Sequence, residues 1–356
     1  MVEKTLLDGD STSRQRFVEL DALRGLAAMA VVLYHYSTQY GDEIGHASRL
    51  PFGFPEGNYG VYLFFMISGF VILMSLERSH SAMDFVVSRV SRLFPAYWSA
   101  VALTAAVVWA CGMPWQLLPA HDLLLNFTMV QQILGGRHLD GSYWTLQVEL
   151  FFYVQMLLWF MAGQLARIHW VIAAWLLLAV SYSLAVRYHM HFSYTAREVL
   201  LLRHIAFFGL GILFHRMHGH PGEKVRNVCM IGLCLGTIAF VGPPVLLLVA
   251  VFGCIVFWLA LAGDLQWLRA RPLVLLGGLS YSLYLLHQAV GFALIRLLEQ
   301  HGLPAGVAVT VVVSAMLVLA FALHRGVEQP AMRILRAAWK HHRELHVAAP
   351  GRATAL

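Results

Sequence analysis

The chain has 356 residues, of which 59% are hydrophobic and only 12% are charged. A single water-soluble core cannot bury that much apolar surface, so the composition excludes an ordinary soluble domain and predicts a protein whose main solvent is lipid. The formal net charge of +6 could suggest nucleic acid binding, but membrane topology explains the basic residues better, and no nucleic-acid partner is expected.

Apolar runs long enough to span a bilayer, which takes roughly 20 residues, recur along nearly the whole chain. They predict an all-α polytopic membrane protein with about ten transmembrane helices in a single bundle. The predicted spans are residues 22–40, 59–77, 95–112, 143–163, 169–186, 199–215, 228–242, 244–263, 277–298 and 304–324. Residues 1–21 are then a polar cytoplasmic segment, 22–330 one transmembrane domain and 331–356 a basic cytoplasmic tail.

The distribution of basic residues predicts the orientation of the bundle. If the N-terminus is cytoplasmic, few basic residues lie in outer loops or near outer helix ends, and these are Arg49, Arg137, Arg187, Arg197, Arg203 and Arg296. The rest of the 25 Lys and Arg residues lie on the inner side, which is a positive-inside bias and puts both termini in the cytoplasm. Residues 121–134 are apolar, but an eleventh span there would expose the basic tail outside, so a short interfacial or re-entrant segment is predicted.

Ionisable side chains inside spans are costly, and each is therefore a functional-site hypothesis. The deep ones are His35, Glu149 and His287. Arg24 and His35 are eleven residues apart, which on an α-helix returns to within roughly 20° of the same face, about 16 Å along the axis. One stripe of the first helix would then connect the cytoplasmic side with the membrane interior. An anchoring arginine and a hydrogen-bonded core histidine explain the same spacing equally well.

The depths of His35 and Glu149 agree. With a rise of about 1.5 Å per residue, Glu149 lies about 10 Å into its span from the outer end and His35 about 20 Å into its span from the inner end, in a core about 30 Å thick. A carboxylate beside a histidine can fix its tautomer and stabilise the imidazolium, as general-base catalysis requires. The alternative is a structural Glu149 bonded to Tyr153, one turn on.

The inner segment SRVSRLFPAYW carries Arg89 and Arg92 just before the third predicted span. If the segment is helical, the i, i+3 spacing puts both guanidiniums on one face, an arrangement that suits phosphate binding. Solvated anchors at the inner surface explain the pair as well. The four cysteines have neither metal-ligand nor redox spacing, so no metal site is expected.

Six segments in the right order resemble the signatures of the acyltransferase-3 family of integral membrane acyltransferases, from residue 19 to about 330. ELDALRGLAAMAVVLYHY carries an Arg-x10-His motif at Arg24 and His35, and SRVSRLFPAYW carries an Arg-x-x-Arg motif. GSYWTLQVELFFY contains Trp144, Glu149 and Tyr153 at the positions of another motif. The remaining segments are FFMISGFVI, LSYSLYLLHQ and GVEQP.

The resemblance implies an enzyme of the bacterial cytoplasmic membrane that moves an acyl group, commonly acetyl, from cytoplasmic acyl-CoA to a hydroxyl of a carbohydrate or related acceptor. Acyl-CoA is then a substrate, and no bound cofactor is expected. Arg24, Arg89 and Arg92 would hold the CoA phosphates. His35, oriented by Glu149, would remove the proton of the acceptor hydroxyl without an acyl-enzyme.

Other residues in the matched motifs are expected to line the cavity or contact the acceptor, and these are Asp21, Ser142, Trp144, Tyr153, Ser280 and His287. The acceptor itself stays open among a polysaccharide repeat, a lipid-linked sugar or glycolipid, a peptidoglycan precursor and a macrolide-like metabolite. The oligomeric state is equally open.

Three other functions fit parts of the pattern. Ser68 could be a nucleophile, but no Gly-x-Ser-x-Gly turn surrounds it. A proton-coupled transporter or flippase of a glycan or lipid-linked substrate could use a buried histidine and carboxylate, although paired broken helices do not stand out in the two halves. A non-catalytic membrane scaffold would tolerate substitution of His35 and Glu149.

Overall fold

The computed structural model describes residues 17–111, 113 and 116–348, and within them all regular elements are helices. The long ones are α1 (Val18–Tyr34), α3 (Gly60–Glu77), α4 (Ala82–Ala110), α6 (Trp144–Met161), α7 (Ile168–Arg187), α9 (Ile205–Gly219), α10 (Lys224–Val241), α11 (Pro244–Ala262), α12 (Arg271–Gln300), α13 (Ala305–Leu323) and α14 (Gln329–Ala348). The short ones are α2 (Tyr40–Glu43), α5 (Ala120–Asn126) and α8 (Tyr194–Val199).

Each predicted span overlaps a long helix, but not every one of these helices is long and apolar enough to be a candidate membrane span. By length and composition, 7 helical segments of the described chain qualify. The spans predicted at 22–40, 143–163 and 199–215 correspond to α1, α6 and α9, which are shorter or more polar and fall outside that set. The ten-span count and the cytoplasmic side of both termini therefore stay predictions. Residues 121–134 form the short helix α5 followed by turns.

The third long helix, α4, begins earlier than predicted. Ser81 caps it by accepting a hydrogen bond from the backbone N–H of Asp84 at 3.1 Å, and the helix continues through Pro95 to Ala110. A side-chain oxygen at the N-cap satisfies one of the unpaired N–H groups of the first turn, which is why the helix can start there. The inner segment that carries Arg89 and Arg92 is consequently helical.

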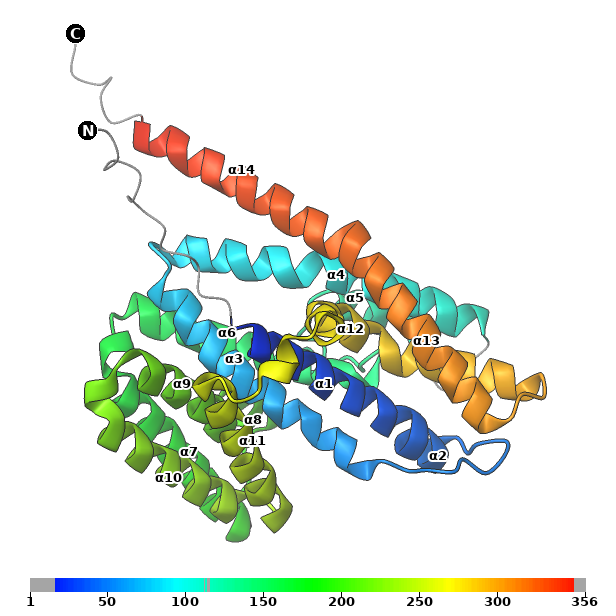
Figure 1. Cartoon of the computed structure of the whole chain (residues 1–356), viewed down its shortest axis with the longest axis horizontal. Coiled ribbons are helices and arrows are strands. Elements are labelled where there is room, and N and C mark those ends of the chain that lie inside the picture. Colours follow the sequence, from blue (N-terminus) through cyan, green and yellow to red (C-terminus); the bar gives the residue numbers. More distant parts are fainter. Residues whose placement is uncertain (1–16, 112, 114–115, 349–356) are drawn as a thin grey trace, which may run out of the picture.

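The predicted tail at 331–356 is a helix over most of its length. After α13, a π-helical turn (His324–Glu328) leads directly into α14. Trp339 Nε1 donates to Asp84 at 2.7 Å and Arg343 Nη1 donates to the same carboxylate at 3.2 Å, so α14 is anchored to the start of α4. Figure 1 shows α14 running beside α4 and projecting from the body. Residues 349–356 of the predicted tail, and 1–16 of the predicted N-terminal segment, lie outside the described residues.

Glycines bring the central helices into backbone contact. A Cβ atom on Gly25 of α1 would lie 2.5 Å from the backbone N of Gly277 in α12, and one on Gly69 of α3 would lie 2.1 Å from the carbonyl oxygen of Phe208 in α9. Only glycine fits at such distances, a common device where helices pack in lipid. The pairs α1 with α12 and α3 with α9 form the centre of the bundle (Figure 1).

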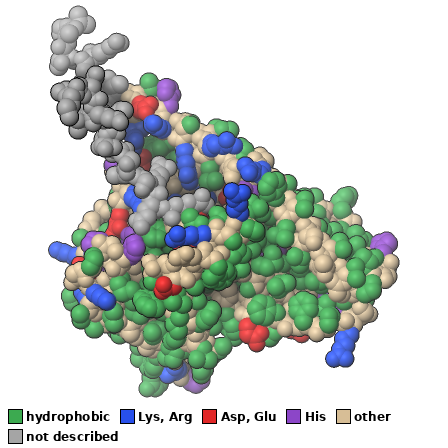
Figure 2. All heavy atoms as spheres, in the orientation of Figure 1, with side chains coloured by type: hydrophobic (Ala, Val, Ile, Leu, Met, Phe, Trp, Pro, Cys, Tyr) green, Lys and Arg blue, Asp and Glu red, His purple; other side chains and the backbone are tan. Residues whose placement is uncertain are grey.

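Large apolar side chains cover the outside of the bundle. In Figure 2 hydrophobic side chains occupy most of the body, while Lys and Arg side chains gather near α14. Trp109, Trp170 and Leu248 have 77%, 77% and 69% of their surface exposed. So much exposed apolar surface is the signature of a surface that faces lipid.

Candidate active site

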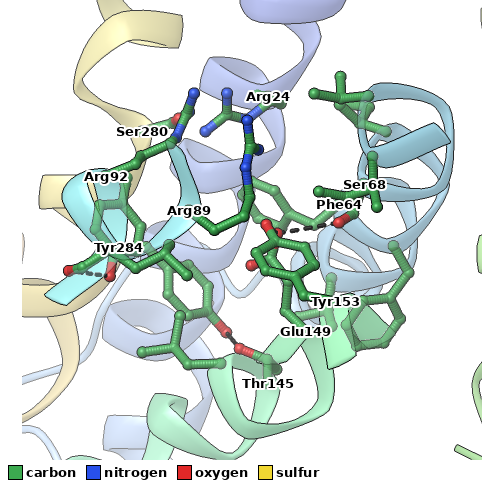
Figure 3. Close-up of a pocket in the computed structure, with 18 residues that line it drawn as sticks. Arg24, Phe64, Ser68, Arg89, Arg92, Thr145, Glu149, Tyr153, Ser280 and Tyr284 are labelled. Carbon is green, nitrogen blue, oxygen red and sulfur yellow. Dashed lines mark hydrogen bonds between the residues drawn. The ribbon is translucent and has the colours of Figure 1, made fainter. Parts of the chain in front are cut away.

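A basic pocket lies between α1, α3, α4, α6 and α12 (Figure 3). Its empty volume is about 740 Å³, including space open to solvent, and its lining includes Arg24, Arg89, Arg92 and Glu149. Because α4 is helical at Arg89 and Arg92, both side chains leave the same face of this helix. The three guanidiniums gather at one end of the pocket (Figure 3).

The guanidiniums of the basic pocket are only weakly neutralised. Arg24 is 4.0 Å from the carboxylate of Asp21, and Arg89 donates to the hydroxyls of Ser75 and Ser88 at 3.3 and 3.2 Å. Arg89 Nε is buried without a partner, and Arg92 forms no hydrogen bond or ion pair with any described residue. Unpaired guanidinium N–H groups in a partly enclosed space favour a ligand with several negative charges, such as phosphate groups.

Glu149 faces the basic pocket from α6. Its Oε1 accepts hydrogen bonds from Ser68 Oγ of α3 at 3.0 Å and from the hydroxyl of Tyr153, one turn on in α6. The Tyr153 ring also lies under Arg89, 5.9 Å from the guanidinium carbon. Glu149, Ser68 and Tyr153 therefore form one connected polar group in the wall of the pocket, next to Arg89 (Figure 3).

A pair of histidines lies beyond the basic pocket. His35 begins a π-helical turn (His35–Gln39) at the end of α1, a distortion that often accompanies functional residues. Its Nδ1 is 2.7 Å from the Val31 carbonyl oxygen and 3.3 Å from Nε2 of His287 in α12. His287 Nδ1 is 2.8 Å from the Tyr284 carbonyl oxygen. Both side chains are buried.

These contacts determine the tautomers of the two rings. A carbonyl oxygen can only accept, so Nδ1 carries the hydrogen in both His287 and His35. The single Nδ1 hydrogen of His35 is then shared between two acceptors, the Val31 carbonyl oxygen and Nε2 of His287. The lone pair of neutral His35 is consequently on its Nε2, the atom that would act as a base.

No hydrogen bond joins His35 to Glu149 among the described residues. Among the described contacts His35 bonds to Val31 and His287, whereas Glu149 bonds to Ser68 and Tyr153. Equal depth in the membrane does not fix the rotation of two helices about their axes. Tyr284 lies between the two groups, because it lines the basic pocket and its ring centroid is 5.2 Å from that of His287.

A buried carboxylate that the sequence analysis missed holds the backbone beside His287. Asp140, fully buried, accepts hydrogen bonds from the N–H and hydroxyl of Ser142 at 2.8 and 2.5 Å, and from the N–H of Ala289 at 2.8 Å. Tyr36 of the π-helical turn donates to the carbonyl of His287 at 2.6 Å. Asp140 directly precedes the segment GSYWTLQVELFFY, and an Asp-Gly pair predicts only a turn from sequence.

The remaining predicted residues separate into distinct places. Ser280 and Tyr153 line the basic pocket, and Trp144 lines a second cavity. Asp21 and Ser142 do not line either one: Asp21 lies beside Arg24, and Ser142 is bonded to Asp140.

Sequence comparison identifies the family to which this arrangement belongs. The model of a family described as an acyltransferase domain matches residues 17–325. The chain belongs to the acyltransferase-3 family. As a member of this membrane family with several apolar helices long enough to cross a bilayer, it is an integral membrane protein.

Relatives of this acyltransferase-3 chain include proteins of bacteria and a phage. Nodulation protein 10 of Rhizobium leguminosarum bv. viciae is 29% identical over 201 residues, 47% of this chain and 50% of that protein. The O-acetyl transferase of Shigella phage Sf6 is 30% identical over 147 residues, 38% of this chain and 43% of that protein. The putative membrane-bound transacylase BcsY of Komagataeibacter xylinus is 35% identical over 127 residues, 35% of this chain and 28% of that protein. The matched regions thus span half or less of these relatives, and no solved structure matches the chain.

Proposed function

We propose that the chain is a membrane-embedded O-acyltransferase that moves an acyl group, acetyl in the simplest case, from cytoplasmic acyl-CoA to a hydroxyl of a carbohydrate or related acceptor. The observation that carries the proposal is the pocket of Arg24, Arg89 and Arg92, which ends one side-chain layer away from the pair of His35 and His287. A polyanion site and a buried base therefore adjoin in a chain of an acyltransferase family.

In this proposal the three arginines bind the phosphates of CoA at the end of the bundle that faces the cytoplasm of a bacterial cytoplasmic membrane. The pantetheine arm follows α1 from Arg24 toward His35, a distance of about 16 Å along the helix axis. Tyr284 closes the pocket at the far end, with its hydroxyl 2.9 Å from Thr145 Oγ1. The Tyr284 side chain therefore has to rotate before the thioester meets the histidine.

The transfer needs one base and no covalent enzyme intermediate. His35 Nε2 takes the proton of the acceptor hydroxyl while the oxygen forms a bond to the thioester carbonyl carbon. The carbon–sulfur bond then breaks, the CoA sulfur leaves, and the imidazolium returns the proton to it, so that an ester and a free thiol result. His287 and the Val31 carbonyl hold the ring in the required tautomer.

Glu149 keeps a catalytic role in the proposal, but from the donor pocket. Its bonds to Ser68 and Tyr153 would fix the polar wall against which the thioester lies, and its negative charge would offset part of the positive charge of Arg24 and Arg89. The O-acetyl transferase of phage Sf6 and the transacylase BcsY support acyl transfer by their names. A carbohydrate acceptor follows from the family resemblance.

The decisive experiment separates donor binding from chemistry in the purified full chain. Isothermal titration measures acetyl-CoA binding, and release of free CoA thiol measures turnover. We expect His35→Ala to bind acetyl-CoA as wild type does and to lose turnover by about a hundredfold or more, the usual contribution of a general base. Wild-type turnover in His35→Ala would refute the base assignment. A wild-type protein that neither binds acetyl-CoA nor releases CoA would favour a transporter or scaffold.

A further inference from the structure

A second cavity, which we call the aromatic cavity, opens at the other end of the bundle. It lies between the first residues of α3 and α6, the helix α8, the start of α9 and the turn between α10 and α11, with an empty volume of about 1180 Å³ including open space. Arg89 contacts Ser75 near the end of α3, whereas Tyr59 and Tyr62 of this cavity lie at its start. The aromatic cavity therefore lies at the opposite end of α3 from the arginines of the basic pocket.

Aromatic rings form much of its lining. Tyr59, Tyr62, Trp144 and Tyr194 all contribute. Trp144 is only partly buried, and its ring centroid is 5.5 Å from that of His204. The negative face of an aromatic ring attracts groups with partial positive charge, which include the C–H groups on the face of a sugar ring.

The cavity also carries one unneutralised positive charge. Arg197 pairs with Glu198 at 2.7 Å, so these two charges cancel. Arg203 is exposed and forms no hydrogen bond or ion pair with any described residue. Close to it, His204 Nδ1 is buried without a hydrogen-bond partner. A guanidinium favours a ligand with a negative group, and a ring nitrogen without a hydrogen-bond partner favours a ligand with hydroxyls.

We infer that the aromatic cavity binds the acceptor, and that this acceptor is a saccharide with an acidic group. Trp144 and the tyrosines would stack on the sugar rings, Arg203 would bind the carboxylate or phosphate, and His204 a hydroxyl. The inference rests on the proposed function, because it names the substrate class and the site of the same reaction.

The position of the aromatic cavity fits this role. Phe65 lines the basic pocket, and its ring centroid lies 6.4 Å from that of Trp144 and 5.3 Å from that of His204, which both line the aromatic cavity. A thin aromatic partition therefore separates the two spaces. Donor and acceptor would approach it from opposite ends of the bundle, which keeps each out of the other's site.

Binding of two chemically defined probes tests the inference on the purified full chain. The probes are p-nitrophenyl β-D-glucuronide, which carries a carboxylate, and p-nitrophenyl β-D-glucoside, which does not. Saturation-transfer NMR gives the two dissociation constants. We expect the glucuronide to bind about tenfold more tightly than the glucoside, as one additional charge-assisted hydrogen-bonded pair provides. Absence of binding by both, or equal binding, would overturn the inference.

Variants with matched controls assign that binding to the cavity. Arg203→Gln should remove the preference for the glucuronide and Arg203→Lys should retain part of it, while Trp144→Leu should weaken both probes about fivefold. Arg187→Gln and Trp109→Leu remove an arginine and an exposed tryptophan outside the cavity and should change nothing. Wild-type binding in Arg203→Gln and Trp144→Leu would place the saccharide elsewhere and refute the inference.

CoA release in the same preparations separates the two proposals. If the protein consumes acetyl-CoA but binds the probes without dependence on Arg203 and Trp144, the acceptor site is wrong and the proposed function stands. If the probes bind as expected but acetyl-CoA is neither bound nor consumed, the cavity is a saccharide site and the acyltransferase proposal fails.

Discussion

Helices α12 and α11 differ in how deeply they are buried and in how polar their side chains are. In its most apolar stretch α12 is 72% buried, and its mean hydropathy is the lowest of the candidate spans among the described residues. The span of α11 has the highest mean hydropathy of that set, yet it is only 22% buried. α12 carries Ser280, Tyr284 and His287, and α11 is almost wholly apolar. In lipid, apolar residues can face outward and polar residues must face other helices. Of these two helices, the one that carries polar side chains is therefore the central one.

The largest effect is expected where α12 meets α1. A Cβ on Gly277 would lie 2.1 Å from the carbonyl oxygen of Asp21, whereas a Cβ on the next residue, Gly278, would have its nearest neighbour at 4.0 Å. We expect Gly277→Val to prevent recovery of monodisperse protein in size-exclusion chromatography, because the two backbones must separate. Gly278→Ala is the matched control and should behave as wild type. Normal folding of Gly277→Val would show that the fold does not depend on close backbone packing between α1 and α12.

A smaller effect is expected at the buried carboxylate that holds α12. Asp140→Asn replaces an acceptor of three hydrogen bonds by an amide with one oxygen, so the Ala289 N–H or Ser142 loses its partner. A hydrogen bond to a charged group contributes about 1.5–3 kcal/mol. We expect a lower thermal midpoint and slower CoA release at unchanged acetyl-CoA affinity. The control is Asp122→Asn, whose carboxylate lies in the first turn of the short helix α5 beside Arg137, and an equal response of both variants would contradict the assigned role.

The arginines of the basic pocket should affect substrate use rather than the fold. For Arg92→Gln we expect the KM for acetyl-CoA to rise about tenfold with little change in kcat, because a phosphate contact is made equally in the ground and transition states. Arg78→Gln removes an exposed arginine at the same end of the bundle and should leave KM unchanged. A flat KM in Arg92→Gln would remove the phosphate role.

The least effect is expected on α11. Phe252 has 66% of its surface exposed, so Phe252→Leu exchanges one lipid-facing apolar side chain for another. Stability and CoA release should stay close to wild type, since a surface substitution of this kind changes stability by about 0.5 kcal/mol or less. A loss comparable to that of Asp140→Asn would mean that α11 contributes to the site and that the contrast with α12 is too simple.

Much of this architecture follows from the sequence. Long apolar runs predicted the helices, and the family motifs singled out Arg24, Arg89, Arg92, Glu149 and Tyr153, which all line the basic pocket. Their roles stay predictions. The i, i+3 spacing of Arg89 and Arg92 puts both on the face of α4 that lines the pocket. α4 began earlier than predicted because the cap at Ser81 outweighs the polar composition of its first turns.

Contacts across helices could not be predicted in the same way. The depth of a residue follows from its position in a span, but the rotation of each helix follows from packing, and this is why His35 meets His287 instead of Glu149. Asp140 lies in a loop, where hydropathy and periodicity carry no information. The aromatic cavity is built from the ends of several helices and their loops, so only the folded chain brings its residues together.

The glycine contacts have a consequence for motion. Because Gly25 meets Gly277 and Gly69 meets Phe208 at backbone distance, α1 is locked to α12 and α3 to α9, and neither pair can slide without a steric clash. A carrier that alternates its access rocks one group of helices against another. In this molecule we expect contact between the spaces at the two ends of the bundle to depend on rotation of the Phe65 and Tyr284 side chains. Such a rotation would let the reacting groups of donor and acceptor meet while the helices stay in place.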